Sequence, residues 1–194
     1  MGLKQKESCC ILRKKNKVNI KNSIRTIPDF PKKGIMFRDI TSLIKNTKAF
    51  NEVIKLITKI AKQKKITKVV GIDSRGFIFA APVAYNLHIP MLIVRKKGKL
   101  PGKTFKARYS LEYGYDVLEI SKNEITKSDK IMIIDDLIAT GGTAKAASKL
   151  VSKMNLKTIE FVFVIELSEL PGKNKLELMG HSVSSICSFK ESER

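Results

Sequence analysis

The chain has 194 residues, 43% of them hydrophobic, and a formal net charge of +20. This length predicts one domain with a substantial core, and the hydrophobic content argues against wholesale disorder. The lysines are spread along the chain, aromatic residues make up 7% and Trp is absent, so no specific nucleic-acid surface is expected.

The N-terminal residues 1–17 carry six cations and one anion among few apolar residues. This composition predicts a mobile basic extension, residues 1–20, ahead of one folded domain, residues 21–194. The extension lacks a signal-peptide core, and no later run is long enough for a transmembrane helix. The three cysteines fit free thiols in a reducing compartment, so we expect a cytoplasmic protein without a membrane partner.

Helix and strand patterns alternate along the rest of the chain. Apolar residues recur at helical spacing between Phe50 and Ala61, which predicts an amphipathic helix. Further helices are expected after Gly76 and after Gly142. Short apolar runs predict buried strands at residues 68–72, 91–94, 131–134 and 158–165. Strands separated by helices predict an α/β fold with a parallel β-sheet flanked by helices.

The segment from Lys96 to Ile120 departs from this pattern. It contains three glycines, a proline and several cations, and its apolar residues are sparse. A segment of this kind between two buried strands is either a floppy insertion or a functional lid.

The most informative motif is IMIIDDLIATGGT, residues 131–143, where a buried strand ends in a small-residue turn before a helix. Gly141 and Gly142 allow an anion to approach the backbone, and the N–H groups at the helix N-terminus favour phosphate. Asp135 and Asp136 are suited to accept hydrogen bonds from ribose hydroxyls beside that phosphate. A P-loop and a dinucleotide-binding motif are both excluded, because their glycine patterns are absent.

This motif resembles the phosphoribosyl pyrophosphate (PRPP) motif of the type I phosphoribosyltransferase family. Three other segments, residues 27–41, 70–77 and 95–114, resemble the adenine phosphoribosyltransferases within it. The resemblance implies a small N-terminal hood over the base and a flexible β-hairpin loop over a parallel sheet. It also implies purine salvage, in which adenine and PRPP give AMP and pyrophosphate, and a homodimer. Mg²⁺ is expected to bind mainly through PRPP, so no protein metal ligands are predicted.

The resemblance assigns roles to individual residues. In the hood, Phe30–Arg38, the backbone at Met36 would bind the purine edge and Phe37 would pack on the base, unless Phe37 is simply core. Arg38 would touch substrate or instead pair with Asp39. In the catalytic loop, Glu112 would assist proton transfer at adenine and Tyr113 would shield the site.

A second loop, Asp73-Ser74-Arg75-Gly76, resembles the pyrophosphate loop, in which the family often has a cis peptide. Arg95, Lys96 and Lys99 are further pyrophosphate candidates. The expected catalytic residues are Glu112, Arg75 and Asp135. The expected substrate-binding residues are Met36, Phe37, Arg38, Asp73, Ser74, Arg95, Lys99, Tyr113, Asp135, Asp136, Ala139, Thr140, Gly141, Gly142 and Thr143.

Two rival functions fit the PRPP motif. An enzyme for hypoxanthine, guanine or xanthine should lack the hood sequence present at residues 30–40. A PRPP-sensing, nucleic-acid-binding regulator would suit the basic charge, but it has no need for the loop at residues 109–114, and no DNA-reading domain is visible.

Overall fold

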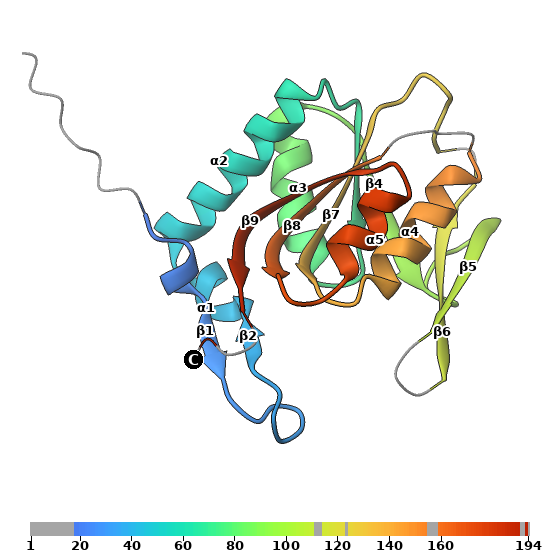
Figure 1. The fold of residues 1–194 in the computed structure, drawn as a ribbon. Helices are drawn as coiled ribbons and strands as arrows, with labels where there is room; N and C mark the ends of the chain where they lie inside the picture. The colour runs from blue at the N-terminus through green and yellow to red at the C-terminus, as the bar shows by residue number, and fades with distance from the viewer. Residues whose placement is uncertain (1–17, 111–113, 123, 155–158, 191–192, 194) are drawn as a thin grey trace, which may run out of the picture.

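A seven-stranded sheet forms the centre of the molecule (Figure 1). The computed structural model describes residues 18–110, 114–122, 124–154, 159–190 and 193. The predicted N-terminal extension therefore falls, through residue 17, outside the described residues. The strand order is β5-β6-β4-β3-β7-β8-β9. The parallel strands are β3 (Lys68–Ile72), β4 (Met91–Lys96), β7 (Ile131–Ile138), β8 (Glu160–Leu167) and β9 (Ser182–Phe189).

Helices cover both faces of this sheet, which confirms the predicted α/β fold. On one face lie α2 (Thr47–Gln63) and α3 (Gly76–Leu87), and on the other lie α4 (Gly142–Ser152) and α5 (Gly172–Leu178) (Figure 1). Each face has its own hydrophobic core. Among the described residues, no helix combines the length and apolarity needed to cross a bilayer.

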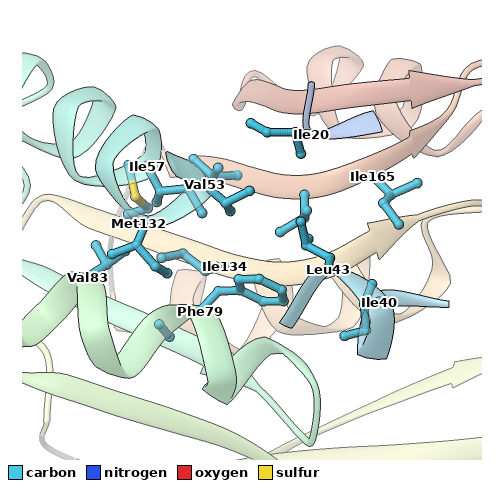
Figure 2. Packing of buried hydrophobic residues seen from close by; sticks show 14 of the residues in the cluster. Ile20, Ile40, Leu43, Val53, Ile57, Phe79, Val83, Met132, Ile134 and Ile165 are labelled. Atoms are coloured by element: carbon cyan, nitrogen blue, oxygen red, sulfur yellow. The ribbon is translucent and has the colours of Figure 1, made fainter. Parts of the chain in front are cut away.

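The predicted stripe on α2 packs into the first of these cores. Val53 and Ile57 are fully buried beside Phe79 of α3 and Met132 of β7, as Figure 2 shows. The helix begins where the Asn46 side chain accepts a hydrogen bond from the backbone N–H of Ala49. The helical spacing of apolar residues therefore predicted this helix correctly, because one of its faces is buried in the core.

A small antiparallel pair, β1 (Arg25–Ile27) with β2 (Phe37–Asp39), lies apart from the main sheet and carries the hood. The short helix η1 (Lys21–Ser23) precedes it, and α1 (Ile40–Lys45) follows. Asp39 caps α1, since its carboxylate accepts the Thr41 N–H at 2.9 Å. This carboxylate also pairs with Arg25 at 2.6 Å, so the expected Arg38–Asp39 pair was wrong.

The structure corrects two strand predictions and confirms the expected β-hairpin. β7 continues through Asp135 and Asp136 to Ile138, because its pairing with β8 extends that far. The segment after Lys96 forms the hairpin, from β5 (Thr104–Ser110) and β6 (Tyr115–Ser121), and β6 pairs antiparallel with the edge of β4. Sequence analysis also missed β9, whose alternating serines gave no continuous apolar run.

Asp129 ties the β6–β7 connection to the start of β3. Its carboxylate accepts hydrogen bonds from the Thr126 N–H and hydroxyl and from the Thr67 hydroxyl, and it pairs with Lys68 at 3.0 Å. Burial alone would raise the pKa of this carboxyl, but these donors together lower its pKa to about 2. The folded pKa thus lies below the unfolded value of 3.8, so the charged form stabilises the fold.

Replacing Asp129 by Asn is expected to destabilise the protein by about 2 kcal/mol at neutral pH, because hydrogen bonds to a charged group are lost. That contribution is complete above the unfolded pKa and is lost as pH falls through the folded one. The gap in Tm between wild type and Asp129→Asn should therefore be constant from pH 7 to 5 and shrink from about pH 4 to 2. Glu124→Gln, on an exposed side chain nearby, is the control. A gap independent of pH would contradict this role for the charge.

Candidate active site

A cavity of about 720 Å³ opens at the carboxyl ends of β3 and β7. This is the edge of a parallel sheet at which loops and helix N-termini converge on a ligand. The lining residues are Asp73, Ser74, Arg75, Lys96, Tyr109, Leu118, Asp135, Asp136, Leu137, Ile138, Ala139, Thr140, Gly141, Gly142, Thr143, Ala144 and Phe163.

The turn from β7 into α4 forms one wall of the cavity. Gly141 has φ +81°, a left-handed conformation that favours glycine, and it opens α4. The turn packs tightly on Gly172 of α5, whose N–H donates to the Ala139 carbonyl at 3.0 Å. Lys175 of α5 donates to the Thr140 carbonyl at 3.1 Å. The free N–H groups of α4 therefore face the cavity from a turn that α5 holds in place.

A second helix N-terminus reaches the cavity from β3. Gly76 opens α3 so close to β7 that a methyl group there would lie 2.6 Å from the Ile134 carbonyl oxygen. The preceding Asp73–Ser74 peptide bond is cis. The Asp73 carboxylate accepts from Arg95 Nε at 3.1 Å. Two helix N-termini thus meet at one cavity, which suits a ligand with two separate anionic groups.

Arg75 and the two adjacent carboxylates form the charged floor of the cavity. Arg75 Nε lies 3.0 Å from Asp136 Oδ2, and Asp136 is 4% exposed. Burial raises the pKa of Asp136, while the Arg75 charge acts in the opposite direction. Burial and the neighbouring Asp136 charge raise the pKa of Asp135 well above its ordinary value. Ionisation of both Asp135 and Asp136 is therefore unfavourable unless a cation or a hydrogen-bond donor binds beside them.

Tyr109 of the hairpin lines the cavity beside the start of α4. Its hydroxyl lies 3.2 Å from Asp116 Oδ2, and Asp116 also pairs with Lys96 at 3.5 Å. Burial and the Asp116 charge raise the pKa of Tyr109 to about 12, while a hydrogen bond with Thr143 opposes the shift. The hydroxyl therefore remains a proton donor at neutral pH.

The structure gathers most of the predicted site residues around this cavity. They are Asp73, Ser74, Arg75, Asp135, Asp136, Ala139, Thr140, Gly141, Gly142 and Thr143, with the further candidate Lys96. Arg95 and Lys99 lie outside the lining, because Arg95 turns to Asp73 and to the Lys99 carbonyl. Glu112 and Tyr113 fall outside the described residues, so their roles stay predictions.

The predicted hood residues Met36, Phe37 and Arg38 lie in three different surroundings. The Phe37 ring lies 5.9 Å from the Arg75 guanidinium, beside the cavity, and is half-buried rather than core. Met36 lines a separate hollow of about 500 Å³ within the hood. The Arg38 side chain is buried against the C-terminal end of the chain and does not line either cavity, so its predicted contact with substrate is not seen.

Sequence analysis did not predict several of the residues that line the cavity. Tyr109 lay within a segment already assigned to the loop, and Leu137 lay within the PRPP-type motif itself. Phe163 of β8 and Leu118 of β6 carried no local signal, because only the sheet order brings these strands to the cavity.

The described part of the chain contains no cluster of three His, Cys, Asp or Glu side chains able to hold a metal ion. The carboxylates nearest to one another in the cavity are Asp135 and Asp136. Their oxygens are of the hard type that Mg²⁺ takes, alongside water and phosphate oxygens.

Comparison with protein families matches residues 39–184 to the phosphoribosyl transferase domain. The chain is 51% identical to the adenine phosphoribosyltransferase of Nitrosomonas eutropha over 90% of this chain and all of that protein. It is 50% identical to that of Pelagibacter ubique, over 89% of this chain and 98% of that one.

Solved structures give the same result for the fold. The adenine phosphoribosyltransferase of Thermoanaerobacter pseudethanolicus superposes with a TM-score of 0.81 at 44% identity, covering 88% of this chain and 98% of that one. The Saccharomyces cerevisiae enzyme, solved with an imino-altritol bisphosphate and adenine, superposes with a TM-score of 0.81 at 38% identity. That match covers 87% of this chain and 96% of that one.

Proposed function

Because the chain belongs to the phosphoribosyltransferase family, among the adenine phosphoribosyltransferases, we propose that its cavity holds PRPP and adenine for this reaction. The protein makes AMP and pyrophosphate from adenine and PRPP, a step of purine salvage. The single observation that carries the residue assignment is the meeting of two helix N-termini over a floor of Arg75, Asp135 and Asp136.

The phosphates of PRPP divide between the two N-termini. The 5′-phosphate binds the α4 turn through the N–H groups and hydroxyls of Thr140 and Thr143. The ribose hydroxyls donate to Asp135 and Asp136, which become better acceptors near a bound cation. The pyrophosphate lies toward Arg75 and Lys96, with the backbone after Asp73.

The base packs between apolar side chains at the mouth of the cavity. Leu137 lines the cavity on one side, and the Phe37 ring beside Arg75 approaches from the hood. The Met36 backbone then binds the purine edge, where a wrong base would leave a polar group unpaired.

Magnesium would be held mainly by the pyrophosphate and ribose oxygens of PRPP and by water, beside Asp135 and Asp136, which bind the ribose hydroxyls. When bound, the ion would supply positive charge to the departing pyrophosphate. The chain's own part is to align adenine N9 with C1′ of the ribose, and Arg75 stabilises the negative charge that develops. Glu112 and Tyr113 would complete the site from the loop, with Glu112 assisting the proton on adenine.

A homodimer and a cytoplasmic location are further parts of the proposal. Ile78 and Tyr85 lie seven residues apart on one face of α3, and both are exposed, as is Ile93 of β4. An apolar face of this kind is consistent with pairing of two copies.

The proposed function is tested by AMP formation from adenine and PRPP with Mg²⁺, run beside hypoxanthine and guanine. Turnover confined to adenine supports both the function and the hood assignment. Turnover with another base would keep the PRPP site but overturn the hood assignment. PRPP binding without any turnover would favour the sensor hypothesis.

The Tyr109 hydroxyl gives a specific prediction for PRPP binding. Tyr109→Phe keeps the ring but removes the donor that links Asp116 to the α4 turn, so we expect the KM for PRPP to rise about fivefold with the KM for adenine unchanged. Tyr115→Phe is the matched control, since that exposed tyrosine of the same hairpin stacks on Arg108 away from the cavity. An equal effect of both variants would contradict the role of Tyr109.

A further inference from the structure

Arg38 is a buried cation on the strand that carries the hood, and it points away from the substrates. It is 2% exposed. Its guanidinium donates to the Thr26 hydroxyl at 2.6 Å and to the main-chain carbonyls of Lys190 at 2.9 Å and Glu193 at 2.7 Å. The two carbonyls lie more than 150 residues further along the chain. Arg38 therefore joins the hood to the C-terminal end of the protein.

The surroundings of Arg38 form a connected cluster. Its guanidinium lies 4.4 Å from the centre of the Phe189 ring, and the Lys21 ammonium lies 4.8 Å from the same ring. Lys21 also pairs with the Glu193 carboxylate at 2.6 Å. In Figure 1, β9, which ends at Phe189, runs to the position of β1 and β2. Lys190 and Glu193 are thus held against the hood by Arg38, and Glu193 is held there by Lys21 as well.

A guanidinium is an unexpected group for this place if only stability matters. Burial of the guanidinium costs desolvation energy, which the charge of Glu193 offsets only in part, because that carboxylate is paired with Lys21. Arg38 Nε also has no hydrogen-bond partner within the described residues. One terminal nitrogen of the planar guanidinium donates to both carbonyls and the other donates to Thr26, and this arrangement defines both the position and the orientation of the strand that carries Arg38. Positioning, rather than net stabilisation, explains the presence of this side chain.

Strand β2 links Arg38 to the cavity through the neighbouring residue Phe37. Side chains alternate across β2, so Phe37 faces opposite to Arg38. The Phe37 ring lies 5.0 Å from the Phe30 ring and 5.9 Å from Arg75, which forms an ion pair with Asp136 in the cavity floor. A shift of Arg38 would therefore move the Phe37 ring and the Met36 backbone relative to the cavity.

We propose that Arg38, bound to the carbonyls of Lys190 and Glu193, makes the C-terminal end of the chain a positioning element for the base-binding strand of the hood. The inference rests on the proposed function, in which the hood holds adenine. It assigns to the C-terminal segment an effect mainly on the base, because PRPP is held by the turns after β3 and β7 and not by the hood.

The test compares two substitutions of Arg38 with a matched arginine of the same hood. Arg38→Met keeps an unbranched side chain but removes every donor, and Arg38→Lys keeps the charge but not the fork. The control is Arg25→Met, because the Arg25 side chain is 63% exposed and contacts Asp39 rather than the C-terminal segment. A chain ended after Lys190 removes the Glu193 carbonyl without changing the hood sequence. The measurements are kcat and the separate KM values for adenine and PRPP.

We expect Arg38→Met to raise the KM for adenine at least about tenfold and to change the KM for PRPP less than about twofold. Arg38→Lys and the shortened chain should show a smaller change in the same direction, and Arg25→Met none. Equal increases in both KM values, or an unchanged KM for adenine, would overturn the inference, since a merely structural role affects both substrates. If Arg38→Met fails to fold, the lysine variant and the shortened chain decide the outcome. Wild-type protein that makes no AMP would instead overturn the proposed function.

Discussion

Arg75→Ala is expected to lower kcat/KM for PRPP by between about 100-fold and 1,000-fold, the usual effect of removing a preorganised donor from a developing negative charge. The loss has a second source. Arg75 is the cation paired with the buried Asp136, whose Oδ2 accepts no hydrogen bond among the described residues. The alanine variant thus loses a ligand for pyrophosphate and leaves a buried carboxylate without its counter-charge.

The Arg75→Ala variant should also have a changed pH profile. Arg75 opposes the rise in the pKa of Asp136 caused by burial, so its removal raises that pKa further. Because the ionised carboxylate is the acceptor for ribose, the acid limb of the activity profile should move to higher pH. The measurement is kcat/KM for PRPP between pH 5 and about 9, with Arg25→Ala as the control for loss of one positive charge.

A double variant separates the two effects of Arg75. Arg75→Ala with Asp136→Asn removes the unpaired charge, so its Tm should recover toward the wild-type value while activity stays low. If activity recovered together with Tm, the role of Arg75 would be to hold Asp136 and not to bind pyrophosphate.

Gly172→Ala is expected to have the second-largest effect, although Gly172 does not line the cavity. A methyl group there would overlap the Ala139 carbonyl oxygen and lie 2.8 Å from the Gly141 nitrogen. Both contacts are backbone atoms of the turn proposed to bind the 5′-phosphate, so the turn itself must move. We expect a destabilisation of about 1–3 kcal/mol and a rise in the Kd for PRPP of at least about tenfold.

Gly180→Ala is the matched control for this substitution. Gly180 lies just after α5, with open space around it but with φ +82°, so alanine there carries a backbone cost and no steric overlap. It should lower Tm modestly and leave the Kd for PRPP unchanged, as measured by titration calorimetry. A similar loss of PRPP affinity in both variants would show that the contact of Gly172 with the turn is not what matters.

The part of the cavity that we propose binds phosphate could be located from sequence because its residues are contiguous. Residues 131–143 hold a strand, two carboxylates, a glycine turn and a helix start in one stretch, and each has a local physical signature. The Asp73–Gly76 loop could be found for the same reason. Even there, sequence placed the end of β7 before Asp135, because pairing with β8 decides how far that strand continues.

The sequence by itself determined the α/β alternation and the amphipathic face of α2, and it located the turn that we propose binds phosphate. All three depend on patterns within about 20 residues. Only the tertiary structure decided that Gly172 packs under that turn, that Tyr109 lines the cavity, and that Arg38 binds carbonyls at the far end of the chain. The physical reason is common to the three. Each depends on a close contact between segments distant in sequence, and the partners of such a contact are fixed by the order and register of the sheet rather than by any local preference.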